Sequence, residues 1–215
     1  MVGAMTFARG ERERLAGLLE AAGPDAGTLC AGWTTRDMAA HLVLRERRMD
    51  AAAGIQVKAL AGWTQRVQDG YAARPYEELV RTFRSGPPTV SLFALPGADE
   101  AANLIEYFVH AEDVRRAGDD PSPAEPDPRL ADALWKRLPM VVRFGAGAKP
   151  PVRLTLARPD GRTATVGPKD GPTVTVTGEP GELVLFAYGR GARAAVVADG
   201  APEAVAALAR VLPLP

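Results

Sequence analysis

The sequence predicts an α+β protein of two domains, a helical domain over residues 1–145 and a smaller domain of strands and helices over residues 146–215. Two observations carry this prediction. Before Gly145, apolar residues recur at the 3.6-residue spacing of amphipathic helices. After it, short alternating runs rich in Val and Thr are separated by turn residues. The 215 residues suffice for one large or two small domains.

The first two expected helices have clear ends. Residues 6–22 have apolar side chains at helical spacing, and Gly23-Pro24-Asp25 ends this helix. The next helix begins at Thr34 and Thr35 and is expected to run to about Gln56. A Thr hydroxyl there accepts hydrogen bonds from first-turn amides, and the carboxylate of Asp37 lies at the positive end of the helix dipole.

The rest of the helical domain is less regular. Within residues 60–97, only residues 76–84 show a short helical pattern. Residues 99–117 predict a long helix, and residues 118–128 are rich in Pro and acidic side chains, which is typical of a linker. The last helix of the domain covers residues 129–144, with a break or kink expected near Pro139.

The smaller domain alternates strands and helices. Residues 152–156 and 162–166 predict a hairpin, because Pro159-Asp160-Gly161 between them is a turn sequence. The pattern then predicts further strands at 173–177 and 194–198 and helices at 182–188 and 202–212.

Composition excludes several partners. The 26 basic and 26 acidic residues cancel, so no whole-protein field attracts nucleic acid or an anionic membrane. The apolar runs are too short for a membrane span, and charged residues precede any apolar stretch of signal-peptide length. A single cysteine, Cys30, fits a reducing cytoplasm. We therefore expect a cytoplasmic protein, and its Ala-, Gly- and Arg-rich composition suggests a bacterial source.

The scarce residue types limit the possible chemistry. The three serines include none in a G-x-S-x-G sequence, which argues against a serine hydrolase of that type. Gly189-Arg190-Gly191 follows a helix and not a strand, so it lacks the context of a dinucleotide-binding loop. Histidine chemistry has only His41 and His110 to use.

A helical pair of potential metal ligands lies at Glu106 and His110. Four residues apart on a helix, their side chains share one face, and a third ligand from a facing helix would complete a site with open positions for water or substrate. His41, midway along another helix, is available for that role. Two interpretations stay open at this point, a metal site and an ordinary Glu–His surface contact.

Three motifs add a resemblance. The segment from Trp33 to Leu42 (W-T-T-R-D-M-A-A-H-L) resembles the W-[ST]-x-x-D-[LM]-x-x-H-L signature of the DinB-like, mycothiol-dependent maleylpyruvate isomerase superfamily. Glu106, His110 and Asp113 resemble the E-x-x-x-H-x-x-D of its later helix. Residues 174–190 resemble its small, sterol-carrier-like second domain, so the resemblance covers almost the whole chain in the expected order.

The resemblance implies a fold and a ligand set. The fold would be an up-and-down four-helix bundle followed by a small α/β domain. The metal ligands would be His41, Glu106 and His110, with Zn²⁺ as the expected ion, although nickel, iron or manganese suit the same set. Asp113 would either orient a ligand or pair with Arg116 or Arg45. Some relatives have two consecutive histidines where this chain has His110-Ala111, a departure from the pattern.

The resemblance also implies a reaction, a mycothiol-dependent isomerisation or S-transfer on a small-molecule substrate. A thiolate held by the metal adds to a cis double bond conjugated with a carbonyl, the resulting single bond rotates, and the thiol leaves to give the trans product. Arginine forks suit the substrate's carboxylates, and Arg190 is the first candidate catalytic residue, followed by Arg45.

The competing hypothesis is a non-catalytic protein that binds a small molecule or serves in a stress response, with the metal only pinning the helices. A structural metal site is closed by a fourth side chain, whereas a catalytic one keeps a position open. The sequence offers no obvious fourth Cys or His ligand, because Cys30 is interpreted as a small apolar filler. This favours the open, catalytic site.

Overall fold

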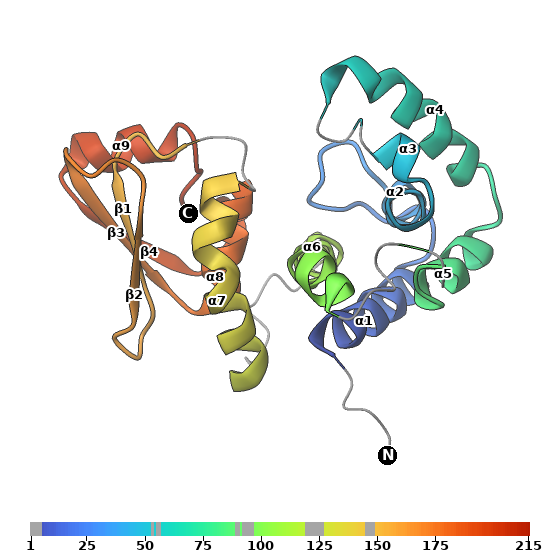
Figure 1. Ribbon diagram of the computed structural model, residues 1–215, viewed down its shortest axis with the longest axis horizontal. Helices are drawn as coiled ribbons and strands as arrows, with labels where there is room; N and C mark the ends of the chain where they lie inside the picture. Colours follow the sequence, from blue (N-terminus) through green and yellow to red (C-terminus); the bar gives the residue numbers. More distant parts are fainter. Residues whose placement is uncertain are drawn as a thin grey trace. The chain divides into compact units, whose positions relative to one another are not determined.

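A computed structural model of the protein describes residues 6–52, 54, 57–88, 91, 97–118, 127–144 and 149–215. The chain forms two compact units, Met1–Asp120 and Pro121–Pro215. Figure 1 shows the elements of each. Among the described residues, no helix has the length and low polarity that crossing a membrane requires.

The first unit is helical throughout its described residues. Its longest helix, α6, packs mainly against α1, while α2 packs against α4 and α5 (Figure 1). The helices are α1 (Phe7–Ala22), α2 (Thr35–Arg47), α3 (Met49–Ala52), the 3-10 helix η2 (Lys58–Leu60), α4 (Ala61–Ala72), α5 (Tyr76–Arg84) and α6 (Ala98–Arg115).

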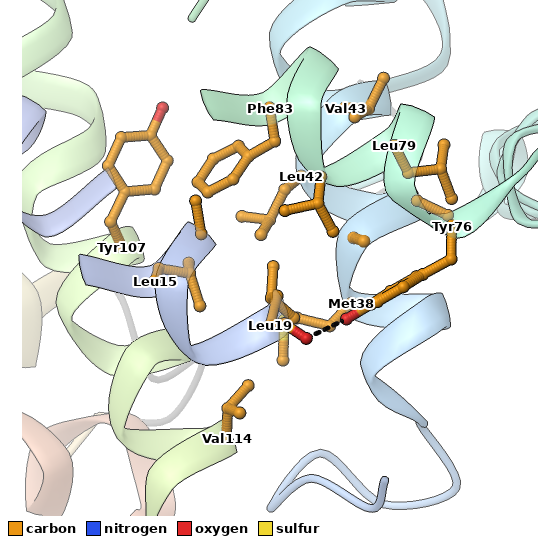
Figure 2. Close-up of a cluster of buried hydrophobic side chains, with 14 of the residues drawn as sticks. Leu15, Leu19, Met38, Leu42, Val43, Tyr76, Leu79, Phe83, Tyr107 and Val114 are labelled. Carbon is orange, nitrogen blue, oxygen red and sulfur yellow. Dashed lines mark hydrogen bonds between the residues drawn. The ribbon is translucent and has the colours of Figure 1, made fainter. Parts of the chain in front are cut away.

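Four helices share the core of this unit. Figure 2 shows apolar side chains from α1, α2, α5 and α6 pointing toward one another, among them Leu15, Leu42, Phe83 and Tyr107. The Tyr76 hydroxyl donates a 2.7 Å hydrogen bond to the Leu19 carbonyl, which joins α5 to α1 (Figure 2). Both α2 and α6, the helices that carry the predicted metal ligands, contribute side chains to this core.

The start of α2 was predicted correctly, but its end was not. Thr34 and Asp37 form a capping box, in which each side chain accepts a hydrogen bond from the backbone N–H of the other. The helix stops at Arg47, short of the predicted end near residue 56, because Arg48 leaves the helical region with φ −128° and ψ 72°. Helical structure resumes in the short helix α3 and later in α4. The sequence pattern did not predict α4.

The second unit is built around a four-stranded sheet in the order β2-β1-β3-β4. Strand β1 pairs antiparallel with β2 through the predicted hairpin and parallel with β3, which pairs antiparallel with β4. Its elements are α7 (Pro128–Phe144), β1 (Arg153–Ala157), β2 (Thr163–Val166), β3 (Thr173–Gly178), α8 (Pro180–Leu185), η4 (Phe186–Arg190), η5 (Gly191–Arg193), β4 (Val196–Gly200) and α9 (Pro202–Ala209).

The two faces of this sheet differ in polarity. Leu154, Leu156, Val174 and Val176 are fully buried, while the residues that alternate with them, mostly threonine, are half-buried or exposed. Period-two alternation places these two sets on opposite faces. One face therefore supplies the apolar core of the unit, against which helices pack.

Helix α7 belongs to this second unit. It packs against α8, η4 and β2, and it buries Leu134, Leu138 and Val142. The division after Asp120 therefore lies before this helix, whereas the sequence-based boundary after residue 145 had grouped it with the helical domain. The helix also continues through Pro139, so the alternative of a break at that position is not observed.

Candidate metal centre

His41, Glu106 and His110, which are far apart along the chain, come together in the first unit. His41 lies on α2, and Glu106 and His110 lie one turn apart on α6. Glu106 Oε1 is 3.6 Å from His41 Nε2 and 3.3 Å from His110 Nε2. One ligand atom from each residue lies within 4.8 Å of the others, so the structure brings together all three predicted ligands.

The spacing of these atoms suits a divalent cation. With bonds of about 2.0–2.2 Å to nitrogen and oxygen, neighbouring ligands of a tetrahedral zinc ion lie roughly 3.3–3.5 Å apart. The two measured N–O separations, 3.6 and 3.3 Å, are close to this edge length. Two imidazoles and one carboxylate are also the protein ligands of many catalytic zinc sites, so the residues fit the metal that the resemblance implies.

Asp113 contacts one of these three predicted ligands. Its Oδ2 atom lies 3.0 Å from His110 Nδ1, on the side of the ring opposite the cluster. A carboxylate at Nδ1 holds the proton there and leaves Nε2 to face the cluster, as in carboxylate–histidine–zinc triads. Of the two roles considered for Asp113, the structure shows the contact required for orienting His110.

The cluster is shielded from solvent. His41 and His110 are buried, and their rings meet edge to face at a centroid distance of 5.5 Å. Trp33, just before α2, packs against the His41 ring at 4.9 Å. Low exposure strengthens electrostatic interactions among these groups and restricts the motion of the ligands.

The protonation states follow from burial and mutual contacts. Burial lowers the pKa of His41 below its ordinary value, and the hydrogen bond to Glu106 offsets only part of that effect. Burial alone would raise the pKa of Glu106, but hydrogen bonds from His110 and His41 and the charge of Arg45 hold it well below its usual range. The neutral imidazole of His41 and the carboxylate of Glu106 are the forms that coordinate a cation.

His110 behaves differently from His41. Burial would lower its pKa, but hydrogen bonding to Asp113, Cys30 and Glu106 raises the value well above the ordinary one. In the metal-free protein, His110 therefore carries a proton that a bound cation would displace.

The two predicted catalytic arginines lie in different units. Arg45, one turn after His41 on α2, has its Nε 3.4 Å from Glu106 Oε1 and donates to the Ala102 carbonyl and the Asn103 side chain. Arg190, in η4 of the second unit, donates a 2.7 Å hydrogen bond to the Tyr188 carbonyl. Arg45 is thus adjacent to the cluster, and the role of Arg190 remains a prediction.

Sequence reasoning missed two residues at this centre. Cys30 was interpreted as an apolar filler, but its Sγ lies 3.2 Å from Asp113 Oδ2. Asn103 is fully buried and contacts Arg45 through its side-chain oxygen. The position of Asn103 one turn before Glu106 on the same helix was an available signal, whereas nothing in the sequence near Cys30 indicated a contact with α6.

Fold and cluster together define a class of protein, with a helical unit that holds a His-Glu-His cluster, followed along the chain by a small unit containing a β-sheet. Residues 8–91 match the family described as the mycothiol maleylpyruvate isomerase N-terminal domain. This segment is similar to that domain and contains the motif from Trp33 to Leu42, which supports the resemblance seen in the sequence. The match includes His41 and ends before α6.

Two solved structures resemble the whole chain. Both are crystal structures of the mycothiol-dependent maleylpyruvate isomerase, one of them a mutant, and both align with a TM-score of 0.51 over 90% of this chain and 90% of theirs. Their sequence identities to this chain are 16% and 15%, so the likeness shows a shared fold. No match was found to a curated protein sequence.

Proposed function

We propose that the protein is a metal-dependent isomerase or S-transferase of the maleylpyruvate isomerase type, with mycothiol as its thiol cofactor and a small unsaturated molecule as its substrate. The observation that carries the proposal is the convergence of His41, Glu106 and His110 in a cluster in which both histidines are buried and Glu106 is half-buried. The match of residues 8–91 to the N-terminal domain family supports the thiol cofactor. Zinc is the metal that this donor set suits best.

The three ligands would leave at least one coordination position for the thiol. A divalent ion there would lower the pKa of a bound thiol and keep it nucleophilic at neutral pH. Glu106 would supply a negative charge that partly balances the ion, and His41 and His110 would hold it through their imidazoles. Asp113 holds the His110 ring in the required orientation through the 3.0 Å contact at Nδ1.

Arg45 is placed to act on an anionic substrate. Its guanidinium lies beside Glu106 and is anchored on α6 through Ala102 and Asn103. With Glu106 bound to a cation, Arg45 would be able to attract a substrate carboxylate. We propose the same role for Arg190, on the basis of the resemblance of its segment to that of the family.

The proposal retains the broader expectations from the sequence. The first unit would be a DinB-like bundle, the second a sterol-carrier-like domain, and the protein would act in the bacterial cytoplasm. The shared fold with the two isomerase structures supports the two domain assignments.

The test compares Glu106→Gln with the wild type and with Glu77→Gln, an exposed position on α5 that serves as the matched control. Zinc affinity is measured by competition with a chromophoric chelator, and isomerisation is measured with mycothiol and a cis-configured α,β-unsaturated dicarboxylate. We expect Glu106→Gln to weaken zinc binding more than the roughly 10–100-fold typical of outer-shell changes, and to abolish activity. Unchanged zinc affinity in Glu106→Gln would contradict the proposal.

A cobalt-substituted protein separates the enzyme from the non-catalytic alternative. If a coordination position is open, added mycothiol binds Co²⁺ and produces a thiolate-to-cobalt absorption band. A spectrum that mycothiol leaves unchanged would instead indicate a closed site, and the protein would then be a metal-stabilised binding module.

A further inference from the structure

A second group of potential metal ligands adjoins the first. Cys30, His110 and Asp113 each offer a ligand atom, and these atoms lie within 4.8 Å of one another. Asp113 Oδ2 lies 3.2 Å from Cys30 Sγ and 3.0 Å from His110 Nδ1. Asp113 and His110 are buried, and Cys30 is half-buried.

The two groups use opposite sides of one imidazole. Nε2 of His110 faces Glu106 and His41, whereas Nδ1 faces Asp113 and Cys30. A neutral imidazole has one acceptor nitrogen, and the other nitrogen carries the proton. His110 can therefore serve one group at a time as a neutral ligand.

The position of the remaining His110 proton depends on which of the two groups holds the ion. With an ion at Nδ1, the proton lies on Nε2 and is donated to Glu106, 3.3 Å away. With an ion at Nε2, the proton lies on Nδ1 and is donated to Asp113. In each state, the carboxylate of the vacant group accepts the hydrogen bond of His110.

The donor sets differ in softness. The first group offers nitrogen and oxygen, which suit zinc, whereas the second includes a thiol, and thiolates select soft ions. We propose that Cys30, Asp113 and His110 Nδ1 form an alternative site for a thiophilic cation such as Cd²⁺ or Cu⁺. Binding replaces the Cys30 S–H bond with an S–metal bond and the His110 Nδ1–H bond with an N–metal bond, and both protons are released to solvent.

The local backbone supports such a site. Leu29 N–H donates a 3.0 Å hydrogen bond to the Asp113 carbonyl, which fastens the segment before α2 to α6 next to Cys30. Thr28 Oγ1 accepts a hydrogen bond from the Cys30 N–H. These contacts position the thiol beside the carboxylate before any ion binds, so little ordering is required.

The second site has a consequence for the proposed function. Only this consequence, and not the second site itself, rests on that function. A thiophilic ion at Nδ1 withdraws His110 from the zinc site, because Nε2 must then carry the proton. Zinc and a thiophilic ion would therefore compete for the protein although they share only one ligand residue.

The experiment measures Cd²⁺ and Zn²⁺ binding separately in metal-free wild type, Cys30→Ser, Glu106→Gln and the control Thr28→Val. Cadmium binding is followed by the thiolate-to-cadmium absorption band and by isothermal titration. Cys30→Ser keeps a hydroxyl donor for Asp113, and Thr28→Val perturbs the same segment while keeping the thiol.

We expect Cys30→Ser to abolish the absorption band and weaken Cd²⁺ binding by more than about 100-fold, with zinc affinity changed less than about 3-fold. Thr28→Val should retain the band. Glu106→Gln should weaken zinc binding and leave cadmium binding nearly intact.

The opposite pattern would overturn the inference. Cadmium binding that is lost in Glu106→Gln and unaffected in Cys30→Ser would place the ion in the His-Glu-His cluster. A large loss of zinc affinity in Cys30→Ser would show that the two groups do not discriminate between ions. Unchanged zinc affinity in Glu106→Gln would contradict the proposed function, while the cadmium measurements would still decide the second site.

Discussion

The two units bury different kinds of side chain. In the second unit, the interior is built from Leu, Val, Ala and Phe, and the buried charged residue found there is Glu182. The first unit buries many more polar groups among its described residues: Glu11, Arg12, Thr35, His41, Glu46, Thr64, Gln68, Asn103, His110, Glu112, Asp113 and Arg116.

Buried charges are costly unless they are paired, so the first unit requires a network of partners. Glu112 is 1% exposed and accepts hydrogen bonds from Arg14, Arg115 and Arg116. Nearby on α6, Glu106 and His110 belong to another group of ionisable side chains, in which the two histidines are buried. Among the described residues, the first unit therefore depends on paired buried charges, whereas the second has a mainly apolar core.

The largest effect is expected at Glu112. Glu112→Gln removes the negative charge shared by three arginines, one of which, Arg116, is also 1% exposed. Breaking a buried ion pair from one side costs about 3–5 kcal/mol. Urea denaturation followed by circular dichroism should show this loss in the free energy of unfolding. A loss under 1 kcal/mol would mean that the network contributes little, and the contrast between the units would be weakened.

The free energy of unfolding should depend on this same network at acidic pH. The three arginines hold the pKa of Glu112 at about 2 against burial, below the ordinary value of 4.5. A depressed pKa gives stability that is present above pH 4.5 and is lost as the pH falls toward 2, by about 3 kcal/mol. Burial raises the pKa of the neighbouring Glu11, which contributes with the opposite sign. Unfolding free energies measured from pH 5 to 2 should therefore fall steeply in the wild type and less in Glu112→Gln.

A smaller effect is expected at the start of α2. Thr34→Ala removes the hydroxyl of the capping box, which contacts Asp37 at 2.7 Å. Loss of such a cap costs about 1 kcal/mol. Zinc affinity should change little, because the core fixes His41 about two turns further along. A zinc affinity that falls together with stability would show that the helix end also positions the ligand.

The smallest effect is expected on the exposed face of the sheet in the second unit. Thr177→Val exchanges a hydroxyl for a methyl group at an exposed position of β3. Such surface changes usually alter the free energy of unfolding by no more than about 0.5 kcal/mol. Thermal denaturation should detect almost no shift, and a destabilisation above 1 kcal/mol would indicate that this face is not passive.

Local sequence patterns predicted individual helices and strands better than they predicted which unit each helix belongs to. The short helix Tyr76–Arg84 and the hairpin around Asp160 were predicted because their end signals are local. Helix α4 was missed, since its apolar residues are few and among its buried residues are Thr64 and Gln68. Whether α7 packs on the first or the second unit depends on tertiary contacts, which periodicity does not encode.

At the candidate site, too, local patterns did not predict tertiary contacts. His41, Glu106 and His110 could be singled out because histidines are scarce and motifs placed them in register. The approach of Cys30 to Asp113 could not be predicted, because it depends on how the segment before α2 folds over α6. Residue type and helical spacing identified the ligands, and tertiary structure alone identified their neighbours.

The most direct test of the central claim is X-ray absorption spectroscopy at the zinc edge of the zinc-loaded protein without added thiol. Coordination by His41, Glu106 and His110 predicts two imidazoles and additional oxygen ligands in the first shell, with no sulfur. One imidazole should disappear in His41→Ala. A sulfur scatterer in the thiol-free wild type, or a shell that His41→Ala leaves unchanged, would contradict the assignment.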